Sequence, residues 1–305
     1  MKDHGWKREL KEFEEYLICG EKSRGTIEKY LRDVRTFLRF LKTEETKEPV
    51  GPEGVSGITK EKTIAWKESL VRSGYAAATV NSMLASLNSF LRFYGLFSLC
   101  VRPLRRQRRI FRDRKRELSK EEYLRLVRAA EETGKRRLSF ILQTIASTGI
   151  RISELRFITA ESLRTRRAEV NCKGKQRTVL LTGELCRKLM RYCREEGIAG
   201  GPVFITKNGN PVNRSNIWTE MKRLCSRAGV EPDKVFPHNL RSLFARVFYS
   251  LKRDIAKLAD LLGHSSIDTT RIYIMESGRE HERLVEKMGL MFPGREKSER
   301  RKTKL

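Results

Sequence analysis

The chain has 305 residues, which is long enough for two domains that each bury a hydrophobic core. Lysine and arginine number 65 against 38 acidic residues, and the net charge of +27 favours a polyanion, above all nucleic acid, as the partner. The sequence has no apolar stretch of membrane-spanning length and no secretory signal, so we expect a soluble, cytoplasmic protein, with an anionic membrane surface as the weaker alternative partner.

The residue types present disfavour metal, nucleotide and disulfide chemistry. The six cysteines form no C-x-x-C pair and no metal-ligand spacing with histidine. The acidic residues are scattered among basic ones, whereas two-metal phosphoryl transfer needs converging carboxylates. The sequence also lacks a glycine-rich phosphate loop of the Walker type. We therefore expect neither a metal nor a cofactor.

Residues 1–100 are predicted to form a compact all-α module. Apolar residues recur at helical spacing over residues 6–18 and again over 26–41. A third helix is expected over residues 59–72, with a threonine as its N-terminal cap. A broad apolar face over residues 80–94 predicts the fourth helix.

Residues 101–117 form a basic linker between the two predicted domains, with eight arginines and one lysine against two acidic residues. A charge run is often only a solvated segment. Between two domains, however, we expect it to cross a phosphate backbone, because each contact with a phosphate releases a counterion. The arginines expected to contact DNA are Arg105, Arg106, Arg108 and Arg109.

A second domain is predicted over residues 118–292, followed by a basic tail, 293–305, that is expected to be disordered. Ser119 and Glu122 fit a capping box at the start of its first helix. Residues 138–146 are apolar on nearly every side of a helix, so we expect this helix at the centre of the domain.

The central helix is expected to end at Gly149, because a glycine readily adopts the left-handed conformation that ends a helix. Arg151 follows in the turn before a short helix whose predicted cap is Ser153. The guanidinium of Arg151 therefore lies at the junction of two elements, where it can reach a ligand.

Residues 168–181 predict two short strands joined by a turn at Gly174. Lys173 and Lys175 flank that turn, so two basic side chains lie at the tip of the hairpin. The elements expected after the hairpin are a helix over residues 182–196, a short strand over 203–205 and a helix over 214–228.

The stretch from residue 237 to 273 combines two histidines, an arginine and a tyrosine. A proline opens its first helix, in which His238 and Arg241 lie one turn apart on one face. His264 comes just after the glycine that ends the next helix, and Tyr273 lies two turns into the last one. The residues of the first helix that we expect to face the core are Leu240, Phe244, Val247, Phe248 and Leu251.

These groups are the ones that a phosphodiester transesterification needs. A tyrosine hydroxyl can attack phosphorus and conserve the energy of the diester in a covalent phosphotyrosine, so the reaction needs no ATP. Arginine presents a fork of donors that matches phosphate oxygens, and histidine moves protons near neutral pH. Each motif alone is common in unrelated proteins, and only their joint order is specific.

With Thr-Gly-Ile-Arg-Ile-Ser-Glu at residues 148–154, the hairpin lysine, His-x-x-Arg, Leu-Gly-His and a tyrosine nine residues later, the sequence resembles the tyrosine recombinase (phage integrase) family. The resemblance implies a mainly α fold, with a helical, SAM-like core-binding domain and a mixed α/β catalytic domain that has a small antiparallel sheet. It also implies that Glu154 supports Arg151. The catalytic residues that it implies are Arg151, Lys173, His238, Arg241, His264 and Tyr273.

Two positions depart from the family pattern. Ser242 stands where many members carry histidine, and the hairpin tip is one residue shorter than the common form. The shorter tip leaves the choice of the catalytic lysine open between Lys173 and Lys175, the second of which could instead contact a phosphate. Because the chain begins almost at once with the core-binding module, we also expect it to lack an arm-binding domain.

The resemblance implies a site-specific DNA recombinase for integration, excision or resolution, which needs neither metal nor ATP and forms a 3′-phosphotyrosine at Tyr273. The implied partners are a double-stranded core site, a second protomer on each site, a tetramer in the synapse and, in some systems, an accessory directionality factor. Residues 282–292 would dock on a neighbouring protomer or fold back on their own domain. A type IB topoisomerase-like enzyme and a catalytically silent DNA-binding protein are the alternatives.

Overall fold

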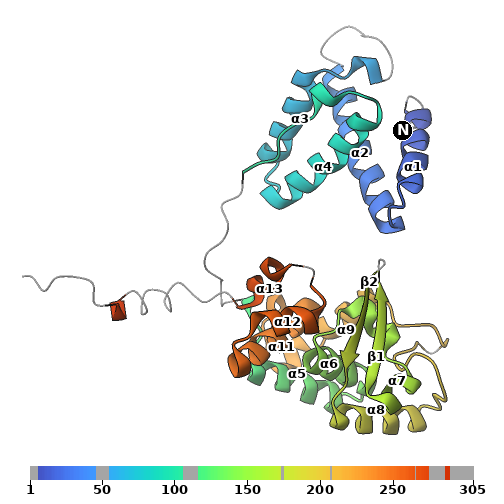
Figure 1. The fold of residues 1–305 in the computed structure, drawn as a ribbon, viewed down its shortest axis with the longest axis vertical. Coiled ribbons are helices and arrows are strands. Elements are labelled where there is room, and N and C mark those ends of the chain that lie inside the picture. The colour runs from blue at the N-terminus through green and yellow to red at the C-terminus, as the bar shows by residue number, and fades with distance from the viewer. Residues whose placement is uncertain are drawn as a thin grey trace, which may run out of the picture. The chain divides into compact units, whose positions relative to one another are not determined.

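The computed structural model describes residues 6–45, 55–105, 116–172, 175–206, 208–264, 266–274 and 286–288. The chain divides into two compact units, Met1–Arg108 and Arg109–Leu305, each with a hydrophobic core of its own (Figure 1). The described part is mostly helical with one small antiparallel sheet, which confirms the predicted fold class. Among the described residues, no helix is both long and apolar enough to span a membrane.

The described part of the N-terminal unit consists of four helices and two 3₁₀ turns. Its core joins large apolar side chains from all four helices, and Phe13, Phe37, Trp66 and Phe90 are almost completely buried. The expected threonine cap is confirmed, because the Thr59 hydroxyl accepts the backbone N–H of Lys62. The elements are α1 (Lys7–Cys19), α2 (Arg24–Glu45), η1 (Val55–Gly57), α3 (Lys60–Arg72), α4 (Ala77–Phe93) and η2 (Phe97–Leu99).

Two asparagines of α4 hold the first residues of the basic linker. The Asn88 side chain donates to the Val101 carbonyl at 2.9 Å and accepts the Val101 N–H at 3.0 Å. Two helical turns earlier, the Asn81 side chain donates to the Leu104 carbonyl at 3.0 Å and accepts the Leu104 N–H at 2.7 Å. The linker backbone therefore runs along α4 up to Leu104. The N–H and C=O groups of Val101 and Leu104 bond to asparagine side chains, as they would bond to a neighbouring strand in a sheet.

We expect Asn88→Ala to expose the backbone of Val101 to solvent, at a cost of about 1 kcal/mol for each hydrogen bond lost. Hydrogen exchange measured on the full chain should show faster exchange of the Val101 amide and unchanged exchange of the Leu104 amide. Asn81→Ala is the matched variant and should give the reverse pattern. Unchanged exchange at both amides in both variants would show that the side-chain clamps do not hold the linker.

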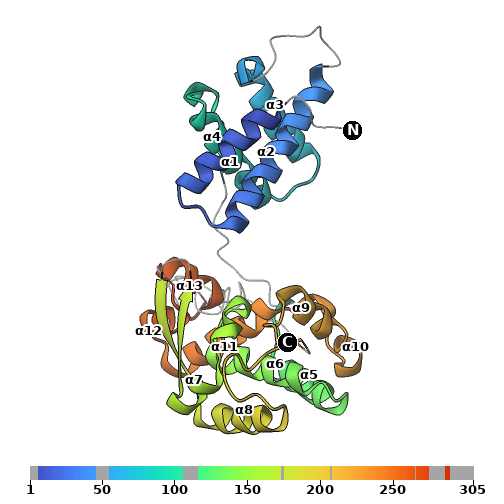
Figure 2. The same cartoon turned by 90° about the vertical axis from the view of Figure 1, so that its right-hand side faces the viewer.

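The second unit is arranged around α6 (Arg136–Thr148), which contacts α5, α8, α9 and α11 (Figures 1 and 2). Leu142 and Ile145 of α6 are fully buried, as expected for the central helix. The predicted capping box is also confirmed at Ser119 and Glu122. The other elements are α5 (Lys120–Glu132), η4 (Ile152–Phe157), α7 (Ala160–Thr165), β1 (Arg167–Cys172), β2 (Lys175–Leu180), α8 (Gly183–Glu195), α9 (Arg214–Lys222), α10 (Cys225–Ala228), η5 (Pro232–Lys234), α11 (Pro237–Lys252), α12 (Ile255–Leu262) and α13 (Ile267–Ile274).

The strands β1 and β2 form an antiparallel hairpin in which Cys172 pairs with Lys175. This register leaves residues 173 and 174 as the connection, where the sequence predicts the turn, although both lie outside the described residues. Ala168 and Val170 of β1 and Val179 of β2 are buried, while Glu169, Thr178 and Leu180 beside them are exposed. One face of the hairpin therefore packs on the core, as strand alternation requires.

The structure differs from four local predictions. The helix expected over residues 214–228 is broken into α9 and α10, and residues 203–205 contribute an isolated bridge at Ile205 but no strand of the sheet. Val247 and Leu251 are exposed, because the buried side chains of α11 all lie between Asn239 and Ala245. The short helix after Arg151 is a 3₁₀ turn that begins at Ile152, and its N-terminal cap is Arg151 and not Ser153.

Candidate active site

Five of the predicted catalytic residues lie at or near the ends of several elements of the second unit. Arg151 precedes η4, His238 and Arg241 lie in the first turns of α11, His264 follows α12, and Tyr273 lies in α13. Ile150 to Ser153, Arg214, Ser215, Trp218, Phe236 to His238 and Arg241 line a cavity of about 610 Å³. The fold thus brings together groups that are up to 122 residues apart in the sequence, from Arg151 to Tyr273.

Arg241 is only 2% exposed and lies between the C-terminal ends of two helices. Its guanidinium donates to the Gly149 carbonyl after α6 and to the Leu262 carbonyl of α12, the second at 2.7 Å. Carbonyls at a helix C-terminus lack intrahelical partners and carry partial negative charge, so they suit a buried cation. Burial, with a smaller effect of the nearby Arg151, lowers the pKa of Arg241 to about 10, and the side chain is still cationic at neutral pH.

The buried carboxylate of Glu154 binds both the backbone and the side chain of Arg151. Its carboxylate is 2% exposed and accepts the Arg151 backbone N–H at 2.9 Å and the Arg151 guanidinium at 2.8 Å. Burial on its own raises the pKa of Glu154, but hydrogen bonds and charges from Arg151 and Arg177 outweigh it, and the net pKa is lowered. Glu154 is therefore ionised, while the Arg151 side chain stays 42% exposed at the cavity.

Arg177 is a site residue that the sequence analysis missed. It extends from β2, is 13% exposed, and donates to the second oxygen of Glu154 at 2.7 Å. The sequence contains one signal for it. In a hairpin with alternating burial, Arg177 occupies an inward position two residues before Val179, where a charged side chain needs a buried partner.

The contacts of His264 determine its tautomer. The Arg241 guanidinium lies 2.9 Å from His264 Nε2 and can only donate, so Nε2 accepts and carries no proton. Nδ1 must then hold the proton and donate it to the Thr270 hydroxyl at 2.8 Å. Burial, followed by the charges of Arg241 and Arg151, lowers the pKa of His264 to about 4. His264 is therefore a neutral imidazole at pH 7.

Tyr273 is 5% exposed and packs between the two histidines. Its ring centroid lies 5.7 Å from that of His264, nearly parallel to it, and 5.3 Å from that of His238. A hydrogen bond with Tyr273 also raises the pKa of Arg241, against the effect of burial. The tyrosine therefore contacts three of the other predicted residues directly.

Several predicted residues cannot be placed. Lys173, Arg106, Arg108 and Arg109 lie outside the described residues, and of Lys175 only the backbone in β2 is described. The side chain of Arg105 is exposed. Within the described residues, no cluster of three or more histidine, cysteine, aspartate or glutamate side chains could hold a metal ion.

The sequence analysis also missed Trp218, which lies on α9 and lines the cavity beside Arg151, His238 and Arg241. About half of its side chain is exposed. The sequence contains no local signal for this position, because a tryptophan on a helix is usually a core residue.

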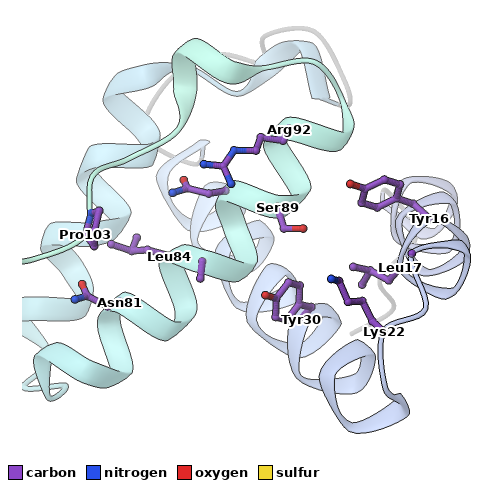
Figure 3. A pocket seen from close by; sticks show the side chains of 12 residues that line it. Tyr16, Leu17, Lys22, Tyr30, Asn81, Leu84, Ser89, Arg92 and Pro103 are labelled. Carbon is purple, nitrogen blue, oxygen red and sulfur yellow. The ribbon is translucent and has the colours of Figure 1, made fainter. Parts of the chain in front are cut away.

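The N-terminal unit has a cavity of about 570 Å³ of its own, lined by α1, α2, α4 and Pro103 (Figure 3). Lys22 and Arg92 contribute positive charge to its wall, and Tyr16 and Tyr30 contribute aromatic rings. Basic and aromatic side chains in one groove are the combination that binds phosphates and bases.

Comparisons with known proteins cover both units. Residues 116–279 match the family described as "Phage integrase family", and residues 10–94 match "Phage integrase, N-terminal SAM-like domain". Tyrosine recombinase XerA of Pyrococcus furiosus is 27% identical over 289 residues, which cover 92% of this chain and 94% of that protein.

Two solved structures share the fold. A lambda integrase dimer bound to a COC′ core site has a TM-score of 0.68 at 18% identity, covering 89% of this chain and 77% of that chain. A lambda integrase tetramer bound to a Holliday junction has a TM-score of 0.69 at 18% identity, covering 91% of this chain and 80% of that chain.

We expect His264 to titrate far below the usual histidine pKa of about 6.5 in the DNA-free protein. NMR of the imidazole nitrogens should show a titration midpoint near pH 4, and at higher pH the proton should be on Nδ1. The signal of His264 is the one that disappears in the His264→Gln variant. Since the folded state binds this proton more weakly than the unfolded chain, His264 should destabilise the fold as the pH falls below about 6.5. A midpoint near 6.5 would contradict the geometry described for the ring.

Proposed function

Since this chain belongs to the phage integrase family and is a site-specific DNA recombinase of the tyrosine type, we propose that Tyr273 is the nucleophile that cuts the DNA strand. The observation that carries the assignment is the contact of the buried Tyr273 with His238, His264 and Arg241. Because packing holds the tyrosine in a single orientation, little has to be reorganised before it attacks.

In the proposed reaction, the Tyr273 oxygen forms a bond to the scissile phosphorus while the bond from phosphorus to the 5′ oxygen breaks. The product is a 3′-phosphotyrosine and a free 5′ hydroxyl. The proton of Tyr273 passes to His238, whose ring lies beside it, since His264 Nε2 is already occupied by Arg241. Attack by the 5′ hydroxyl of another strand reverses the step and rejoins the DNA without ATP.

Arg151 and Arg241 are proposed to stabilise the pentavalent transition state, which carries more negative charge than the diester. Arg241 is preorganised by the two helix ends, and Arg151 by the ionised Glu154. Both cations are thus held in place before the substrate arrives.

The departing 5′ oxygen needs a proton, and we assign its donor to the hairpin tip. Lys173 is our choice over Lys175, because it precedes the glycine at the end of β1, as in the family's motif. A lysine ammonium with a pKa of about 10.4 is protonated at neutral pH and can donate without special tuning.

Binding to DNA is proposed to involve both units. The lysine, arginine and tyrosine side chains around the cavity of the N-terminal unit support contacts with phosphates and bases there. Arg105, Arg106, Arg108 and Arg109 of the linker would cross the phosphate backbone, and Lys175 would add a further contact.

We also propose that two protomers bind each double-stranded core site and that four form the synapse. The lambda integrase structures described above, a dimer on a core site and a tetramer on a Holliday junction, support this assembly. Two further features of the assembly stay predictions: the docking of residues 282–292 on a neighbouring protomer, and an accessory directionality factor. The cytoplasmic location that a DNA substrate suggests is also a prediction. The topoisomerase-like and silent alternatives are not favoured, because the relatives are recombinases.

Tyr273→Phe should abolish the covalent adduct, because the phenyl ring keeps the packing but has no nucleophile. Incubation with a nicked suicide DNA substrate, followed by SDS electrophoresis, measures the adduct. Tyr249→Phe is the matched control, since Tyr249 packs against the same cluster, and it should still form the adduct. An SDS-resistant complex with Tyr273→Phe would reject the assignment.

Lys173→Ala should cleave normal DNA at least 100-fold more slowly, because the 5′ alkoxide is then not protonated as it leaves. Replacing the bridging 5′ oxygen with sulfur makes a leaving group that needs no proton, so this substrate should restore cleavage to nearly the wild-type rate. Lys175→Ala should be affected only mildly on both substrates. The reverse pattern would transfer the role to Lys175, and no rescue of either variant would remove the hairpin from acid catalysis.

A further inference from the structure

Arg177 lies where three parts of the active site meet. From β2, its Nη1 donates to the Leu261 carbonyl at 2.7 Å, and its Nη2 donates to Glu154 at 2.7 Å. Leu261 belongs to the last turn of α12, three residues before His264, and Glu154 is the residue that holds Arg151. One guanidinium therefore joins the hairpin, the η4 turn and the end of α12.

The backbone at the end of α12 leaves space for the Arg177 side chain. Gly263 has a φ of +64°, and a Cβ on it would lie 2.2 Å from Cδ of Arg177 and 2.8 Å from Nε. Only glycine fits this position, both for its left-handed backbone and for the space that Arg177 occupies. The side chain thus packs against the residue immediately before His264.

This placement is unfavourable for folding in one respect. Nε of Arg177 is buried without a hydrogen-bond partner among the described atoms. A buried donor that loses its water without gaining a partner destabilises the folded state. An apolar side chain would avoid that loss, but it would also leave Glu154 and the Leu261 carbonyl without this donor.

We propose that Arg177 is a positioning residue for DNA cleavage, which holds the hairpin, Glu154 and the end of α12 in one arrangement. The inference rests on the proposed roles of Arg151, His264 and Lys173, because these are the groups carried by the three parts that Arg177 joins. A planar fork can bind two acceptors on different elements at once, whereas a lysine ammonium in its place would bind one of them well.

Arg177 also contributes to the electrostatics of His264. Burial is the largest cause of the lowered pKa of His264, and the charges of Arg241, Arg151, Arg177 and His238 lower it further. Removing the Arg177 side chain should therefore raise this pKa from about 4 towards the usual value. The groups around His264 are Arg177 on β2, Arg151 and Glu154 at η4, His238 and Arg241 on α11, and Thr270 and Tyr273 on α13.

The test compares Arg177→Ala with Arg167→Ala, which removes an exposed arginine from the same hairpin. Single-turnover cleavage of a suicide substrate by Arg177→Ala should fall by about 10- to 100-fold, because misplacing reacting groups by about 1 Å can cost about 100-fold. The affinity for the site, measured by gel shift, should change less than about twofold, because many other basic side chains bind the backbone. Arg167→Ala should cleave at the wild-type rate.

The sulfur-substituted substrate separates positioning from a general loss of folded protein. If Arg177 positions the hairpin tip, Arg177→Ala should recover part of its rate on the substrate with a 5′-bridging sulfur, because the misplaced lysine is no longer needed. Rates that fall equally on both substrates in a folded Arg177→Ala protein would overturn the proposal. NMR of His264 in the same variant should show the raised pKa.

Arg177→Lys keeps the charge and serves if the alanine variant does not fold. It should cleave at a rate between those of the wild type and Arg177→Ala and keep the low pKa of His264. Its cleavage rate should also increase on the substrate with a 5′-bridging sulfur. A folded Arg177→Lys protein with the wild-type rate on both substrates would refute the positioning role. A Tyr273→Phe protein that still forms the adduct would instead refute the proposed function, so the two failures are distinct.

Discussion

The catalytic unit depends on a buried guanidinium between two helix ends. Arg241 satisfies carbonyls at the ends of α6 and α12, which would otherwise be buried without partners. Removing one side of such an arrangement leaves uncompensated polar groups in a region of low dielectric, which is far more costly than losing an exposed contact. The same guanidinium also contacts His264, so one side chain determines both how the helices pack and where the site residues lie.

The charges at the site do not balance among the described residues. Arg151, Arg177 and Arg241 lie close to one another, and Glu154 pairs with the first two. Mutual repulsion lowers the pKa of Arg241 in addition to the effect of burial, which means that the cluster opposes the folded state. A phosphate would supply the missing negative charge, so the cost in stability is the expected counterpart of preorganisation for an anion.

Tyr273 combines two roles that are usually separate. It belongs to a small buried cluster with Ala245, Leu258 and Leu262, and its hydroxyl also contacts the buried Arg241. Core packing restricts the rotamer of the ring, and that restriction favours the attack that we propose for Tyr273. His264 stacks on the same ring. It is neutral because burial and the charges of three nearby arginines disfavour the cationic imidazole.

Helix caps, apolar periodicity and motif order are local properties, and from them the sequence alone determined most helices, the hairpin and the order of Arg151, His238, Arg241, His264 and Tyr273. The tertiary structure decided what depends on distant neighbours. Val247 and Leu251 carry the correct helical spacing but are exposed, because burial requires another element opposite them. The protonation of His264 and the role of Arg177, whose partner Leu261 is 84 residues away, arise from charges and carbonyls that only folding brings together.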